Sequence, residues 1–127
     1  MSHATKTRDT GLVIQLNPAL RASISDLSEA SKIMRAREFN SYEEFLEKYG
    51  EPWSDKAFIT LVAYGDGLGY LLYNRLIDID IIEYLSEGTT TGFWEQVRPL
   101  IIGMRKEHSL PSLFERFEYL CEEMKKT

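Results

Sequence analysis

The stretch "AYGDGLGYLL", residues 63–72, places Asp66 among three glycines, Gly65, Gly67 and Gly69. Loops that bind phosphate have the pattern G-x-x-x-x-G-K-[ST], or G-x-G-x-x-G after a strand, and this stretch matches neither. Apolar residues recur around the glycines at helical spacing instead. Gly65 and Gly69 lie four apart on the apolar face, where they would let a second helix approach closely. We therefore predict a helix-packing role for Gly65 and Gly69, with a ligand-binding loop as the alternative.

Asp66 is the residue of this stretch that could do acid–base chemistry. A carboxylate in a helical core needs a cation or backbone donors, because burying it unpaired is costly. Arg98 and Arg105 are seven residues apart and would project from one face of a later helix. We predict a buried polar network of Asp66, Arg98, Arg105 and Glu118. The alternative is an acid–base group in a pocket around Asp66 that binds a small anionic ligand.

The acidic run "DIDIIE" resembles a set of metal ligands only superficially. It lacks the 12-residue spacing and the central glycine of a calcium loop. Asp78 is interpreted as the N-cap of a helix, and Asp80 as an acid in its first turn. The two histidines and the single cysteine have no partners at ligand or triad spacing (His3, His108, Cys121). We predict no metal site, no cofactor and no catalytic residue.

Two adjacent aromatic residues, Phe93 and Trp94, are candidates for a contact surface. Core packing is the alternative for Trp94, which shares a helical stripe with later apolar residues. The acidic helix that contains Asp78, Asp80 and Glu83 is the second candidate for a partner surface.

Helical periodicity covers most of the chain, interrupted by proline, glycine and capping residues. Ser41 and Glu44 form a capping box, Gly50 ends the same helix, and Ser54 is expected to cap the next one. Residues 86–92 are expected to form a loop. Expected helices cover about 18–37, 42–49, 55–72, 78–85, 92–104 and 111–124, the fifth with Pro99 inside it and the last opened by Ser109 and Pro111.

These elements predict an all-α fold, a single-domain bundle of five or six helices. Residues 17–127 would form the helical domain. Residues 1–16 would form a partly disordered tail, in which 11–17 are either a short strand or an apolar lead-in.

Composition limits the classes of function. The chain has 127 residues, 43% of them hydrophobic, with 15 basic and 20 acidic side chains. No apolar run approaches the roughly 18 residues of a membrane helix, and the first residues lack the apolar core of a signal peptide. The segment 49–91 carries seven acidic residues against two basic ones, which accounts for the net charge of −5. We therefore expect a cytoplasmic protein without a membrane contact, and nucleic-acid binding is disfavoured.

The carboxy-terminal half resembles the prokaryotic family called domain of unknown function 4760, over about residues 54–125. The family has an aromatic–acidic–glycine helix, a "glid" turn, a W-E pair, an internal proline, an arginine and a terminal F-E-x-L. The matching residues are Tyr64, Asp66 and Gly69, Leu76 to Asp78, Trp94 and Glu95, Pro99, Arg105, and Phe117, Glu118 and Leu120. The resemblance implies a small helical domain without assigned chemistry and supplies no catalytic residues.

The function expected from these observations is a non-enzymatic protein-interaction or regulatory module. It would act on another protein or on a second copy of itself. A small-ligand-binding protein or enzyme around Asp66 is the alternative. A nucleic-acid-associated regulator is the second alternative, with the basic residues of the first helix as its contacts (Arg21, Lys32, Arg35, Arg37).

Overall fold

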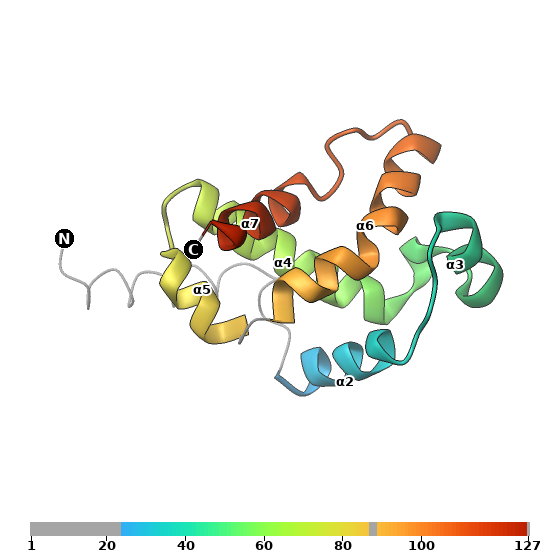
Figure 1. Ribbon diagram of the computed structural model, residues 1–127, viewed down its shortest axis with the longest axis horizontal. Helices are drawn as coiled ribbons and strands as arrows, with labels where there is room; N and C mark the ends of the chain where they lie inside the picture. Colours follow the sequence, from blue (N-terminus) through green and yellow to red (C-terminus); the bar gives the residue numbers. More distant parts are fainter. Residues whose placement is uncertain (1–23, 87–88, 127) are drawn as a thin grey trace.

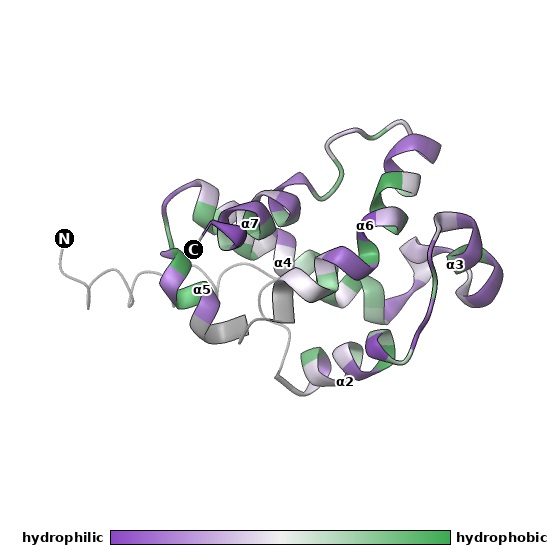
Figure 2. Cartoon of the chain, viewed as in Figure 1, coloured by the Kyte–Doolittle hydropathy of each residue, from purple (hydrophilic) through white to green (hydrophobic). Residues whose placement is uncertain are grey.

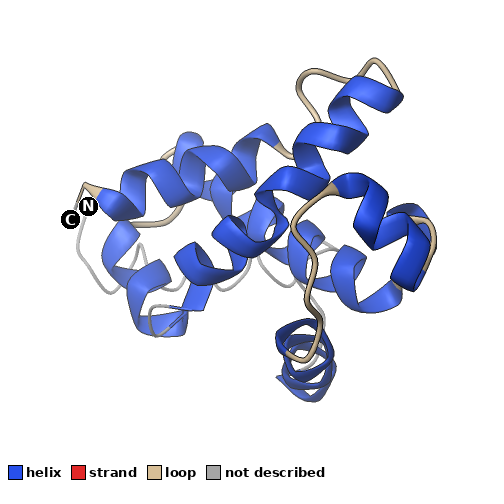
Figure 3. Ribbon diagram, turned by 45° about the vertical axis from the view of Figure 1, so that its right-hand side comes forward, coloured by secondary structure: helices blue, strands red, loops and turns tan. Residues whose placement is uncertain are grey.

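The computed structural model describes residues 24–86 and 89–126, and within them the chain is helical (Figure 1). Figure 3 shows helices joined by short connections, and the described residues contain no strand. The prediction of an all-α domain is confirmed. The α-helices are α2 (Ile24–Arg35), α3 (Tyr42–Tyr49), α4 (Lys56–Tyr73), α5 (Ile79–Ser86), α6 (Thr89–Glu107) and α7 (Glu115–Lys125), and a 3-10 turn, η2, spans Pro52–Ser54.

Helix α4 lies at the centre of the bundle (Figure 1). It packs mainly against α7 on one side and α2 on the other, while α6 contacts α3 and α7, and α5 contacts α7. Helix α4 is rich in apolar residues, whereas α3 is largely hydrophilic (Figure 2). The core that these helices enclose includes the fully buried side chains of Met34, Phe45, Phe58, Leu71, Ile82, Leu100, Ile101, Met104, Phe117 and Leu120.

The ends of α3 follow the predicted capping residues. The Ser41 Oγ accepts a hydrogen bond from the Glu44 N–H at 3.1 Å, and the Glu44 carboxylate accepts one from the Asn40 N–H at 3.3 Å. Gly50 ends the helix with a φ of 87°, and its N–H donates to the Leu46 carbonyl. A positive φ at this position favours glycine, so this boundary was readable from the sequence.

Asp55 rather than Ser54 caps α4, which corrects the sequence-based prediction. Its carboxylate accepts from the Phe58 N–H at 2.9 Å and pairs with Arg37 at 2.8 Å. Ser54 belongs to the preceding 3-10 turn, so the helix starts one residue later than expected. Arg37 also lies over the Tyr49 ring, with its guanidinium carbon 4.7 Å from the ring centroid. One of the basic residues considered for nucleic-acid contact is thus engaged within the fold.

Two predicted boundaries near the carboxy terminus were wrong. Helix α6 begins at Thr89, inside the expected loop 86–92. The modest helix propensity of threonine favours a loop there but does not exclude a helix. Helix α7 begins only at Glu115, since Phe114 has a left-handed backbone with φ of 56° that cannot continue a helix. Pro99 lies inside α6 as expected, and α6 changes direction along its length in Figure 1. The predictions for residues 1–16 and 11–17 lie outside the described residues.

Candidate functional site

Gly65 and Gly69 lie on the buried face of α4, against the start of α7. A β-carbon built on Gly69 would overlap the backbone carbonyl of Arg116, whereas one built on Gly65 would meet the Phe117 ring. At Gly69 the backbones of α4 and α7 therefore lie too close for a β-carbon, and at Gly65 the Phe117 ring occupies the space that one would need.

Asp66 lies between these glycines and is held by the backbone of α7. Its Oδ1 accepts a hydrogen bond from the Phe117 N–H at 3.0 Å, and the Arg116 N–H contributes a second interaction. Helix α7 has Phe114 at its N-cap, which offers no side-chain acceptor. Asp66 therefore caps a helix to which it does not belong, with its carboxylate at the positive end of the helix dipole. Burial raises the pKa of Asp66, and the two backbone hydrogen bonds oppose that shift.

The residues of the predicted polar network separate into two groups. The Arg105 Nε donates to the Leu113 carbonyl at 2.8 Å, and its Nη2 forms an ion pair with Glu118 at 3.0 Å. Arg98, one of the two arginines expected beside Asp66, lies exposed on α6. The structure thus brings Arg105 and Glu118 together and gives Asp66 backbone partners. Arg105 fixes the turn that leads into α7.

Replacing Arg105 by leucine is expected to lower the free energy of unfolding by about 2 to 3 kcal/mol, because the Leu113 carbonyl and Glu118 lose a partly buried cation. Arg98→Leu on the same helix is the matched control and should change the free energy of unfolding by less than about 0.5 kcal/mol. Urea denaturation of both variants measures the difference. Equal effects would mean that Arg105 does not hold the turn.

The predicted aromatic partner surface is mostly packed in the interior. Trp94 is only 3% exposed and its ring lies edge-on to Phe117 at 5.3 Å. Phe93 is half-buried and stacks on the same ring at 5.8 Å. Trp94 therefore belongs to the core and has no exposed ring to offer a partner. Of the acidic residues in and beside α5, Asp80 is exposed, while Asp78 and Glu83 are half-buried and engaged in contacts.

A different aromatic surface lies where α4 and α7 face the solvent. Tyr70 and Tyr73 are 52% and 51% exposed. The Arg116 guanidinium carbon lies 3.7 Å from the centroid of the Tyr73 ring, and the Tyr119 ring packs edge-on against Tyr73 at 5.4 Å. We call Tyr70, Tyr73, Arg116 and Tyr119 the tyrosine surface. Sequence reasoning missed it, although Tyr70 and Tyr73 are spaced three apart, off the apolar face of α4.

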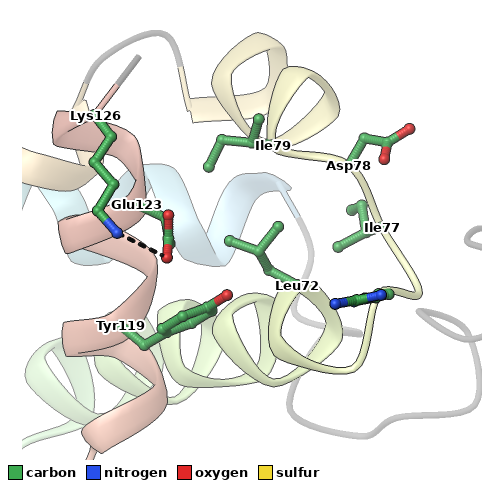
Figure 4. A pocket seen from close by; sticks show the side chains of 8 residues that line it. Leu72, Ile77, Asp78, Ile79, Tyr119, Glu123 and Lys126 are labelled. Carbon is green, nitrogen blue, oxygen red and sulfur yellow. Dashed lines mark hydrogen bonds and ion pairs between the residues drawn. The ribbon is translucent and has the colours of Figure 1, made fainter.

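A pocket of about 400 Å³ adjoins the tyrosine surface, between the end of α4, the start of α5 and the last turns of α7 (Figure 4). Tyr119 belongs to both the surface and the pocket. Three aliphatic and five polar residues line it: Leu72, Ile77, Ile79, Arg75, Asp78, Tyr119, Glu123 and Lys126. A smaller pocket of about 70 Å³ lies between α2 and α4. Asp66 lines neither of the two.

Arg75, which lines the pocket, belongs to a Schellman motif that ends α4. The Leu76 N–H donates to the Leu71 carbonyl at 2.8 Å, and the Arg75 N–H donates to the Leu72 carbonyl at 3.0 Å. Arg75 occupies the left-handed position of this motif, with φ of 59°. Glycine is the usual residue there because a β-carbon is strained in that conformation.

A metal site, a reactive cysteine and a membrane-spanning helix were also considered for the residues that the structure describes. No three histidine, cysteine, aspartate or glutamate side chains among these residues are placed to hold a metal ion. Cys121 is fully buried, and burial raises the pKa of its thiol to about 12, which keeps it protonated and unreactive. None of the described helices combines the length and apolar character needed to cross a membrane.

The fold and these surfaces define a small all-α domain with an exposed aromatic surface and an adjoining pocket. Residues 7–124 match the family described as Domain of unknown function (DUF4760), and the chain belongs to this family. The match extends well beyond the region of the initial resemblance. Neither a curated protein nor a solved structure matches the chain.

Proposed function

We propose that this protein is a non-enzymatic protein-interaction module whose contact face is the tyrosine surface. The observation that carries the proposal is the pair of half-exposed tyrosines, Tyr70 and Tyr73, beside a stacked arginine. Tyrosine and arginine are enriched among the residues that dominate binding energy at protein interfaces. Arg116 and Tyr119 already fix the Tyr73 ring, so little side-chain entropy remains to be lost on binding.

The partner that this surface fits best is a second copy of the chain. A two-fold interface places the same patch on both sides, so it must be self-complementary. The tyrosine surface meets that condition because it contains both a cation and the aromatic faces that attract one. The tyrosine surface also has charges of both signs beside it, because the Glu115 Oε1 lies 3.8 Å from the Arg116 Nη2. Two copies would therefore meet without uniform like-charge repulsion.

Replacing Tyr73 by alanine is expected to weaken self-association at least tenfold, the loss typical of a central interface aromatic. The folded monomer should tolerate the change, since the ring is half exposed. Sedimentation equilibrium over a concentration series measures the dissociation constant, and thermal denaturation at low concentration checks the fold.

Ile102→Ala is the matched control, because Ile102 is 46% exposed on α6 and lies outside the tyrosine surface. It should leave the dissociation constant unchanged. A wild-type protein that stays monomeric at all concentrations, or equal weakening by both variants, would overturn the proposed contact.

A further inference from the structure

We propose that the pocket between the end of α4, α5 and α7 binds an aliphatic carboxylate, with Arg75 as the anion-binding residue. This inference goes beyond the proposed self-association and does not depend on it. It concerns a ligand of different chemistry and is tested by direct binding.

The apolar part of the pocket comes from residues around the Schellman motif. Leu72 belongs to the last turn of α4, Ile77 precedes α5, and Ile79 is the first residue of α5. Figure 4 shows Leu72 and Ile79 on opposite sides of the opening, with the Tyr119 hydroxyl pointing toward Leu72. This arrangement offers an aliphatic floor with a hydroxyl group at its edge, which suits a short hydrocarbon chain that ends in a polar group.

Among the charged side chains that the structure describes around the pocket, Arg75 is the cation without a paired carboxylate. The Lys126 Nζ is paired with the Glu123 carboxylate at 3.3 Å. Asp78 is engaged in a contact of its own, and its carboxylate turns away from the other side chains in Figure 4. Arg75 is exposed, and among the described residues no hydrogen bond or ion pair engages its guanidinium. Arg75 is therefore the group that an incoming anion meets.

The ligand class follows from the shape and the charge of these groups. A guanidinium group presents a planar fork that matches a carboxylate in a bidentate pair. A phosphate carries more negative charge, and Glu123 and Asp78 would repel it more strongly than they repel a monoanion. A volume of about 400 Å³ accommodates a branched aliphatic chain. Each added methylene that reaches the floor is expected to tighten binding about fourfold.

The backbone at Arg75 gives independent support. Glycine would relieve the strain of a φ of 59°, yet an arginine occupies the position. Strained non-glycine residues concentrate at functional sites, where the side chain is retained at a cost in stability.

Aliphatic carboxylates come from two sources, a free acid or the carboxy-terminal residue of a polypeptide. The test titrates the ¹⁵N-labelled full chain with 4-methylpentanoate and, separately, with the peptide acetyl-Gly-Ser-Gly-Leu as the free acid and as the amide. We expect saturable amide shifts at residues 72–79 and at Tyr119. Binding of the free acid comparable to that of the peptide acid identifies a small acid as the ligand. Peptide-acid binding at least tenfold tighter than both other probes identifies a chain terminus.

The decisive variant is Arg75→Gly, which removes the guanidinium and suits the left-handed backbone. It should weaken binding at least tenfold while its melting temperature stays equal to or above that of the wild type. Ser109→Gly is the matched control, since Ser109 also has a positive φ, 54°, but lies outside the pocket. It should bind as the wild type does. Absence of shifts at about 20 mM of either probe, or unchanged binding in Arg75→Gly, would overturn the proposal.

Discussion

Replacing Gly69 by alanine is expected to destabilise the protein by about 3 kcal/mol or more. The added methyl group would occupy the position of the Arg116 carbonyl at the start of α7. A flexible side chain could move aside, but a backbone carbonyl moves only if the whole of α7 shifts. Such a shift would also lengthen the hydrogen bond between Asp66 and the Phe117 N–H. Urea denaturation followed by circular dichroism measures the loss.

Alanine substitutions at two other glycines provide controls for the loss of stability expected in Gly69→Ala. Gly92 lies in α6 with open space around its position, so Gly92→Ala should raise the free energy of unfolding by up to about 1 kcal/mol through helix propensity alone. Gly65→Ala should fall between the two, because the atoms it meets, at 2.7 and 2.9 Å, belong to the Phe117 ring. Wild-type stability in Gly69→Ala would mean that α4 and α7 do not approach as described.

The spacing of Gly65 and Gly69 is visible in the sequence and places both on one helix face, because residues four apart share a face. The ends of α3 were predictable for a similar reason, since capping by Ser41 and Gly50 depends on neighbours within four residues. Helical periodicity likewise predicted the fold class. In each case the determining interaction is local, so the sequence carries it directly.

The partner of Asp66 could not be predicted in this way. Its acceptor role depends on a donor 51 residues later, the Phe117 N–H. That N–H needs an outside acceptor because Phe114 takes a left-handed backbone and provides no cap of its own. Sequence reasoning looked for a cation, since side chains are visible in a sequence and unsatisfied backbone groups are not. For this reason Arg98 was expected beside Asp66, whereas the structure has Arg98 exposed on α6.

The tyrosine surface could not be predicted from the sequence either, because burial depends on which residues pack together in three dimensions. Trp94 and Tyr73 are both large aromatics on helices, and periodicity alone does not show which of them is covered. Trp94 is enclosed by Phe117, while Tyr73 lies at the outer edge of the α4–α7 contact. The pocket was not predictable for the same reason. It forms only when the end of α4, the start of α5 and the last turns of α7 come together.

Replacing Asp66 by alanine is expected to lower the free energy of unfolding by about 2 kcal/mol near neutral pH. The loss arises because the backbone N–H groups of Arg116 and Phe117 are left without an acceptor at the start of α7. Asp66→Asn retains an oxygen in the same position and should cost less than about half as much. Urea denaturation of the two variants separates loss of the acceptor from loss of the charge.

The pH dependence of the same pair tests the electrostatics of this cap. Burial raises the pKa of Asp66 above its ordinary value of 3.8, so the folded protein holds this proton more tightly than the unfolded chain does. The contribution of Asp66 to stability is therefore complete below 3.8 and decreases as the pH rises through the folded pKa. The amide side chain of the Asp66→Asn variant carries no such proton, so the advantage of the wild type over this variant should shrink as the pH rises from that window toward neutrality. An advantage that grows instead would mean that the hydrogen bonds from α7 outweigh burial and that the pKa is lowered. Because the comparison subtracts every carboxylate that the two proteins share, it isolates the buried cap on α7.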